Sequence, residues 1–304
     1  MTKLTLTTLA MAMAASTLAN AAYIDLGVEQ EYYNDDFKNS DNVMPYLGAG
    51  FKPSADSSLA FSFKFSDKQT IASTKHAEDA NGLFGFSSDR GRQDYAVSYT
   101  YNVSDAFTIM PKLTIRHDNF SFNDTHATEY RMHPNMSYKM NDMITLAFDG
   151  FVAPVKLKSS GPKDKTNRKS TSDLKHEADF RVNMTFNDTQ SARVSLYNEA
   201  AKLEAKDSTV NEWQLRLVYA HKFADLTVSP YARIDLSRDL TVGNNSVAPI
   251  RHRAGVNGKY NLGNDFAVVF DVNYQAEKTF NVKTETRGVN KSRMFYNIAI
   301  NYTF

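Results

Sequence analysis

The segment Ser292–Phe304 constrains the fold of this chain more than any other. Every second residue from Met294 to Phe304 is apolar, and the positions between them are polar except Phe295 and Ala299. A repeat of two residues is the signature of a β-strand with one apolar face. A last strand this bulky, ending on an aromatic residue, is typical of a transmembrane β-barrel, in which it pairs with the first strand and leaves no sheet edge in lipid.

The first 21 residues are interpreted as a signal peptide. A basic Met-Thr-Lys start precedes a short apolar run and then Ala19-Asn20-Ala21, which fits an A-x-A cleavage site. The run is too short to cross a bilayer as a helix. We expect residues 1–21 to be removed and residues 22–304 to form one barrel domain, because no linker or change of composition divides them.

The composition fits an exported barrel and argues against other classes. The chain has no cysteine, and no later stretch approaches the roughly 18 apolar residues of a membrane helix. It holds 20 phenylalanines and 16 tyrosines, although its mean hydropathy is low, as expected when only every second residue faces lipid. The net charge of +1 argues against a nucleic-acid partner.

Alternation recurs about fourteen times, in segments of roughly ten residues, and bacterial single-chain barrels have an even number of strands. Tight turns such as Asn141-Asp142 alternate with long polar connections such as residues 156–173. The sequence therefore predicts an all-β fold, a transmembrane antiparallel up-and-down barrel with short periplasmic turns and longer extracellular loops. The predicted strands are residues 23–31, 43–51, 59–66, 94–103, 107–116, 129–138, 144–152, 175–186, 193–196, 212–223, 226–236, 250–260, 266–275 and 292–304.

Four prolines conflict with a regular ladder, because proline has no backbone donor. They lie on the apolar rows of predicted strands, where we expect bulges or strand ends. These residues are Pro111, Pro134, Pro154 and Pro230.

The polar rows carry many charged side chains. A small barrel could not enclose them, because each buried charge needs a partner or water. About fourteen strands lies between filled eight-stranded barrels and sixteen-stranded porins, so we predict an open aqueous channel. For any single residue, cross-linking of the wall is the alternative to a role in transport. The residues predicted to line the pore are Glu29, Glu31, Lys64, Asp94, Lys112, Arg116, Glu129, Arg131, Glu177, Asp179, Arg181, Arg193, Glu212, Arg216, Arg233, Asp235, Arg251, Arg253, Lys259, Asp271 and Arg293.

No catalytic, metal or cofactor site is predicted. The seven histidines are scattered: His221 and His252 fall on lipid-facing rows, and His133 faces inward. Metal-ligand spacings, a glycine-rich phosphate loop and a G-x-S-x-G elbow are all missing from the sequence. We therefore expect a protein that is not an enzyme and needs no cofactor.

Three segments resemble strands of the outer membrane porin G family: residues 180–188, 229–236 and 295–304. Together with length and segment count, the resemblance covers the whole mature chain. It implies a monomeric fourteen-stranded porin that passes ions, mono- and oligosaccharides with little selectivity. In that family a loop between strands eleven and twelve can cover the pore and paired histidines help to open it. Here that loop would be residues 239–248, and the neighbouring strands offer only His252.

A second hypothesis is a channel for acidic oligosaccharides, similar to the oligogalacturonate-specific channels. Guanidinium groups suit carboxylates, and an arginine track could consist of Arg233, Arg251, Arg253 and Arg293. Nearby carboxylates such as Asp271 argue against it. A barrel hydrolase, an adhesin and a structural barrel are the remaining alternatives.

The expected location is the outer membrane of a Gram-negative bacterium. Expected partners are membrane lipid and lipopolysaccharide, small sugars as solutes, and the barrel assembly machinery. The machinery would read the C-terminal strand, and Tyr302 and Phe304 are the predicted assembly signal. Arg293 and Asn297 lie on the other face of that strand and would line the pore.

Overall fold

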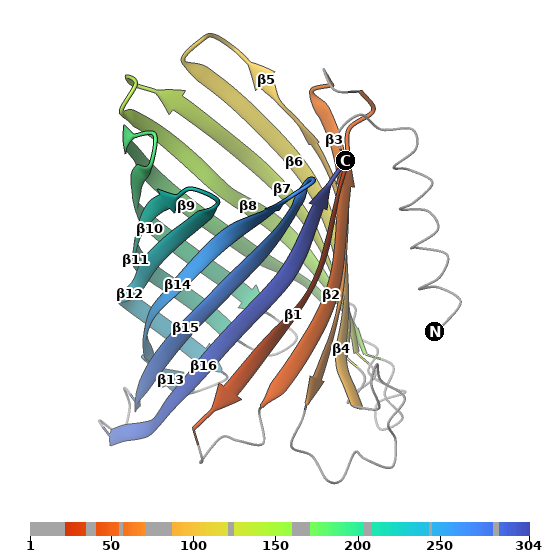
Figure 1. Cartoon of the computed structure of the whole chain (residues 1–304). Coiled ribbons are helices and arrows are strands. Elements are labelled where there is room, and N and C mark those ends of the chain that lie inside the picture. Colours follow the sequence, from red (N-terminus) through yellow and green to blue (C-terminus); the bar gives the residue numbers. More distant parts are fainter. Residues whose placement is uncertain are drawn as a thin grey trace.

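A closed antiparallel β-barrel holds nearly all described residues of the computed structural model (Figure 1). The structure describes residues 22–34, 41–54, 57–70, 87–120, 125–159, 171–203, 208–242, 245–281 and 286–304. The fourteen long strands are β1 (Ala22–Tyr33), β2 (Asn42–Phe51), β3 (Leu59–Thr70), β4 (Ser87–Tyr99), β6 (Phe107–Phe120), β7 (Thr125–Lys139), β8 (Ile144–Ser159), β9 (Thr171–Asn187), β10 (Gln190–Leu203), β11 (Ser208–Phe223), β12 (Leu226–Val242), β14 (Ile250–Gly263), β15 (Phe266–Asn281) and β16 (Thr286–Thr303). Two short strands, β5 (Tyr101–Asn102) and β13 (Asn245–Val247), extend the ladders of their neighbours.

The last strand closes the barrel against the first, as the sequence predicts. Strand β16 runs antiparallel to β1 over eleven paired positions, with Tyr302 opposite Ile24 and Ile298 opposite Val28. Figure 1 shows the two strands side by side, with the C-terminus at the upper rim. Closure pairs the backbone groups of both edge strands, which lipid could not hydrogen-bond.

The two rims differ in their connections. We call the rim that holds Ala22 and Phe304 the turn end (upper in Figure 1) and the opposite rim the loop end. Turn-end connections are tight, such as Asn264-Asp265, where both residues have positive φ (49° and 65°) as a type I′ hairpin turn requires. The predicted alternation of short and long connections is confirmed. The predicted signal peptide lies outside the described residues.

Apolar side chains point away from the barrel. Leu26, Leu113 and Ile298 are 61%, 58% and 56% exposed, and each belongs to a row of alternate apolar residues. In water such a surface would be costly, whereas in lipid it is the expected outer wall. Among the described residues no helix is long and apolar enough to cross a membrane.

The prolines explain the gaps in the ladders. Pairing between β7 and β8 is interrupted between Met132 and Met136, where Pro134 lies on β7. It is interrupted again between Glu129 and Met132, where Pro154 lies on β8. The ladder is likewise interrupted at Pro111 between β4 and β6, and at Pro230 between β11 and β12. In an antiparallel sheet the backbone groups of one residue point to a single neighbour, so each proline weakens one seam and leaves the other intact.

The expectation of bulges at these prolines is wrong, and among the four a strand end occurs only beside Pro111, opposite the end of β4 at Tyr99. Register continues unchanged past each of them, and the register shifts lie elsewhere, for example between Trp213 and Gln214.

The strands are longer than predicted, with 10 to 18 residues each. Residues 117–128 separate the predicted strands 107–116 and 129–138, but β6 continues to Phe120 and β7 begins at Thr125. The other long connections are shortened in the same way. Near the loop end both faces of a strand are polar, so the alternation disappears from the sequence while the backbone pairing continues.

Candidate functional site

Contacts that skip a strand identify the inner face of the barrel. Lys68 on β3 pairs with Glu31 on β1 at 3.4 Å, and Arg251 on β14 pairs with Glu212 on β11 at 2.8 Å. A whole strand lies between the partners in each case. Side chains converge on the concave side of a curved sheet and diverge on the convex side, so these contacts form inside. The polar rows therefore face the lumen.

Strand register places every residue predicted to line the pore on these inward rows. Lys64 lies opposite Asp94, Asp94 opposite Arg116, and Arg116 opposite Glu129, so one inward row crosses four strands. His133 also faces inward as predicted, with its Nε2 3.3 Å from the hydroxyl of Thr114. Their part in transport stays a prediction.

On β4, β6 and β7, three arginines of the inner wall, Arg92, Arg116 and Arg131, each pair with a carboxylate. The Arg92 guanidinium donates two hydrogen bonds to Asp118, at 2.7 and 2.9 Å. Arg116 binds Asp94 in the same way, at 2.7 and 2.8 Å. Such bidentate pairs fix both side chains and cancel their charges. We call this region the paired arc, and it consists of Arg92, Asp94, Arg116, Asp118, Glu129 and Arg131.

Glu129 is one of two buried carboxylates of the paired arc, with 3% of its surface exposed, and Asp118 is the other, at 4%. Two cations approach Glu129 at 2.5 Å: Arg131 from its own strand and Lys175 from β9. A buried carboxylate is tolerated only with such compensation.

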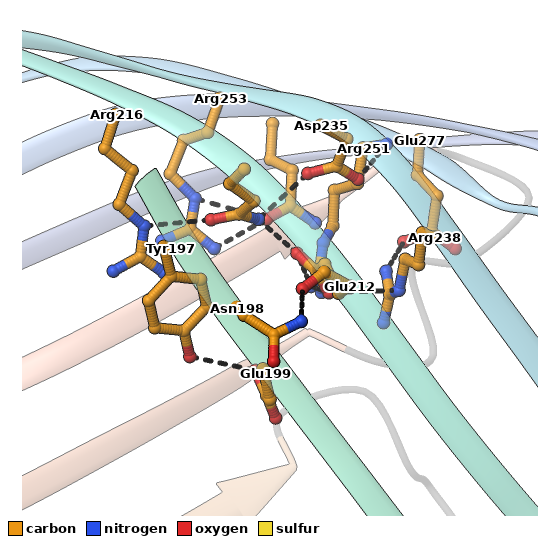
Figure 2. A network of polar contacts seen from close by, with 12 residues as sticks. Tyr197, Asn198, Glu199, Glu212, Arg216, Asp235, Arg238, Arg251, Arg253 and Glu277 are labelled. Atoms are coloured by element: carbon orange, nitrogen blue, oxygen red, sulfur yellow. Dashed lines mark hydrogen bonds and ion pairs between the residues drawn. The ribbon is translucent and has the colours of Figure 1, made fainter. Parts of the chain in front are cut away.

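A second buried cluster surrounds Glu212, which is 1% exposed (Figure 2). Arg251 and Arg238 approach its carboxylate at 2.8 and 3.1 Å, and the Gln214 amide donates to it. The same amide donates to Asp235 at 2.9 Å, and Asp235 accepts the backbone N–H of Arg251 at 2.6 Å. The network ties β11, β12 and β14 together near the loop end.

Beside this cluster, and on the same three strands, arginines face one another. Arg216 on β11 lies opposite Arg233 on β12, which lies opposite Arg253 on β14. Among the described residues, neither Arg233 nor Arg253 has a carboxylate partner. Arg216 stacks on the ring of Tyr197 at 3.2 Å, and its nearest carboxylate, Asp179, is 3.9 Å away. Like charges in directly opposed positions destabilise a sheet.

The row of directly opposed positions continues across the neighbouring strands. On one side Arg253 lies opposite Gln275, which lies opposite Arg293. On the other side Arg216 lies opposite Ser195, which lies opposite Arg181. Arg181 lies six residues from Asn187 at the turn end of β9, whereas Arg293 lies ten residues from Thr303 on β16. Because strands in a barrel are tilted and staggered, such a row climbs the wall. We call it the arginine row, and it consists of Arg181, Arg216, Arg233, Arg253 and Arg293.

Other inward charges also have no ion pair within the described part of the chain. Glu177 and Glu199 lie directly opposite each other, and the Tyr197 hydroxyl donates to Glu199 at 3.2 Å. Lys112 and Arg193 likewise have no carboxylate within ion-pair distance among these residues. Unpaired charges need water, so the inner wall is a hydrated surface.

The arginine track expected from the sequence contains one residue that is not in the row and lacks two that are, Arg181 and Arg216. Arg251 was expected to belong to it, but its guanidinium is held by Glu212.

Sequence reasoning missed several inward residues at the loop ends. Arg92, Asp118, Arg238 and Glu277 fell in or beside segments taken for loops. Extending the two-residue repeat past the apolar part of each strand would have found them. Two inward tyrosines were missed for another reason, because an aromatic residue carries no sign of which face it occupies. They are Tyr46 and Tyr197, whereas Tyr231 already falls on the polar row of residues 226–236 in the sequence.

No protein-family model matches this chain, and no curated protein matches its sequence. Its fold is similar to that of solved membrane channels. A mutant of the TodX monoaromatic hydrocarbon channel gives a TM-score of 0.51 at 9% identity, covering 93% of this chain and 89% of that chain. The Pseudomonas putida toluene transporter TodX gives 0.50 at 10% identity, with the same coverage. Structural neighbours include outer-membrane channels and porins, and at such identities the likeness shows the fold alone.

Proposed function

We propose that this chain is a monomeric outer-membrane porin that passes ions and small hydrophilic solutes by passive diffusion. The porin G resemblance of its sequence supports this function, with mono- and oligosaccharides as solutes. The residues predicted to line the pore would form its wall.

The charged inner wall carries the proposal. Charges such as Arg233, Arg253 and Glu177 have no ionic partner among the described residues, so each must be solvated. A dry interior would leave them uncompensated at several kcal/mol each. A closed barrel with a hydrated, charged wall supports diffusion of polar solutes.

The two solved structures of TodX, a channel named for aromatic compounds, suggest a hydrocarbon as the solute. The inner wall of this chain argues against it. Its buried apolar side chains, such as Phe151 and Val155, sit beside the Glu129 and Arg131 pair rather than in a continuous apolar path. Arg131 itself lies 4.1 Å over the Phe151 ring.

Planar-bilayer recording of the purified, refolded protein tests the proposal. We expect stepwise conductance, and liposome swelling with small neutral sugars. Folded protein without conductance would overturn it and would favour an adhesin or structural barrel. We expect conductance to change little between neutral and mildly acidic pH, because His252, beside the β12–β14 connection, faces outward.

The arginine row favours a second candidate, a channel for acidic oligosaccharides. Three consecutive inward positions, Arg216, Arg233 and Arg253, offer guanidinium forks that match carboxylates. Glu177 and Glu199 on the adjacent strands oppose a purely anionic preference. Swelling rates for matched neutral and acidic oligosaccharides separate the two candidates. Faster entry of the acidic series favours the second candidate, and equal rates favour the first.

The C-terminal strand would serve assembly as well as closure. The Tyr302 ring packs against Phe266 at 4.4 Å and against Phe304 at 4.5 Å, on the outer surface of the turn end. We expect deletion of Phe304 to impair insertion in cells while leaving the conductance of refolded protein unchanged. Arg293→Ala should do the reverse. If insertion is normal without Phe304, it is not the assembly signal.

A further inference from the structure

A polar, cationic patch interrupts the apolar outer wall at the loop ends of β6, β7 and β8. On β6 and β7, His117 lies opposite Thr128, and Asn119 lies opposite His126. On β7 and β8, Thr128 lies opposite Lys156, and His126 opposite Lys158. We call these six outward residues the outer patch: His117, Asn119, His126, Thr128, Lys156 and Lys158.

The patch begins where the apolar band ends. The outward row of β7 is apolar from Tyr138 to Tyr130, and then continues with Thr128 and His126. Lys156 holds its ammonium 5.7 Å from the Tyr130 ring, and both residues are exposed. Tyrosine favours the boundary between acyl chains and headgroups, and lysine extends its charge beyond it.

The polar groups within the patch hold one another in place. The His117 and His126 rings are stacked, with centroids 6.1 Å apart and planes 8° apart. His117 Nδ1 lies 2.9 Å from the Thr128 hydroxyl, and His126 Nδ1 lies 2.5 Å from Asn119 Oδ1. The two lysines therefore project from an ordered surface.

Within the part of the chain that the structure describes, no carboxylate on this face balances the charge of the two patch lysines. Across β6, β7, β8 and β9, the described outward residues include no carboxylate. Lys156 and Lys158 form no ion pair with any residue that the structure describes, whereas Glu129, on the inner face of β7, is held by two cations.

The turn end, at the opposite rim of the barrel, provides a comparison because its outward row ends in aromatic residues instead of cations. There the outward row ends in the rings of Phe266, Tyr302 and Phe304. An unbalanced pair of lysines just beyond the apolar band matches a leaflet whose headgroups carry phosphate at that depth.

We infer that the outer patch binds the phosphate groups of lipid A, the membrane anchor of lipopolysaccharide. Lys156 and Lys158 supply the charge, and the histidine and amide groups beside them supply hydrogen bonds. This inference rests on the outer-membrane location in the proposed function, but it does not depend on conductance.

The test compares binding of lipid A by purified protein in mixed micelles. Each lysine near a membrane surface contributes about 1 kcal/mol, so Lys156→Gln with Lys158→Gln should weaken binding of diphosphorylated lipid A on the order of tenfold or more. The two Lys→Arg substitutions should retain binding. Removal of the phosphates from lipid A should weaken its binding to the native protein and should change its binding to the Gln variant little.

Matched controls separate this site from the channel. Arg233→Gln with Arg253→Gln also removes two cations, but from the inner wall, and should leave lipid A binding unchanged. Lys278→Gln removes one outward loop-end lysine on β15 and should have at most a fivefold effect, about 1 kcal/mol. The Gln variant of the patch should conduct normally, so loss of channel activity and loss of lipid binding are distinguishable.

Two results would overturn the inference. One is equal affinity of the native protein and the Gln variant for diphosphorylated lipid A. The other is full competition by inorganic phosphate at concentrations comparable to those of the lipid, which would show a simple phosphate site instead of a lipid site.

Discussion

The arginine row and the paired arc are built from the same side chain but in opposite ways. In the paired arc, Arg92 and Arg116 each meet a carboxylate through two hydrogen bonds below 3 Å. In the arginine row, Arg233 and Arg253 meet another arginine. The first arrangement cross-links the wall and cancels its charge. The second leaves the charges of Arg233 and Arg253 facing the lumen, whereas Arg181 and Arg293 at the two ends of the row pair with Asp179 and Glu31.

This contrast teaches that pairing decides what a charged wall does. The whole chain is nearly neutral, with 35 basic and 34 acidic residues, yet among the described residues its inner surface has a neutral region at the paired arc, unpaired positive charges at Arg233 and Arg253, and unpaired negative charges at Glu177 and Glu199. A solute would experience the unpaired charges most, because a bidentate pair presents a dipole with a short-ranged field.

The largest effect should come from removing the unpaired charges. We expect Arg233→Gln with Arg253→Gln to lower the anion-to-cation permeability ratio by roughly tenfold, because two net charges leave a confined lumen. The free energy of unfolding should change by under about 1 kcal/mol, since opposed like charges contribute no stability. Bilayer reversal potentials and urea unfolding in micelles measure both quantities.

A charge-neutral control in the paired arc sharpens that result. Asp94→Asn with Arg116→Gln removes a complete pair and should change the permeability ratio by less than about twofold. If this double variant changes the ratio as much as the arginine-row variant, pairing does not distinguish the two regions.

The next effect should come from converting a paired region into an unpaired one. Glu212→Gln would free Arg251 and Arg238, and we expect the anion-to-cation ratio to rise about threefold. The free energy of unfolding should fall by about 3 kcal/mol, because two cations lose a partner that is 1% exposed. Glu212→Asp keeps the charge and serves as the control. An unchanged ratio in folded Glu212→Gln would contradict the prediction.

The two regions also differ in how far the sequence predicted them. Alternation in strands such as β16 was enough to predict the fold, closure and the inward face of Arg116 or Arg233, because a side chain's face depends only on its parity. Pairing was not predictable. Arg92 and Asp118 meet because β4 and β6 continue into segments without alternation, and Arg251 is captured by Glu212 from two strands away.

The paired arc can also be opened at a single residue. Asp94→Asn would leave Arg116 without its carboxylate, and we expect the permeability ratio to rise by about twofold. Stability should fall by about 2 kcal/mol, less than for Glu212, because both partners retain nearly a fifth of their exposure. The paired substitution Asp94→Asn with Arg116→Gln should restore the ratio. A double-mutant cycle without coupling would show that the pair is dispensable.

The smallest effect separates charge from shape within the arginine row. Arg216→Lys keeps the positive charge but loses the stacking on Tyr197, where the guanidinium lies 3.2 Å from the ring centre. We expect the permeability ratio for small ions to change by less than about 1.5-fold, since the net charge is the same. Block of the ion current by a short acidic oligosaccharide should weaken about threefold, because a planar fork on a ring is already oriented for a carboxylate. Arg193→Lys is the control, since among the described residues Arg193 has no aromatic partner. Equal block in both variants would mean that the arginine row acts on solutes through charge alone.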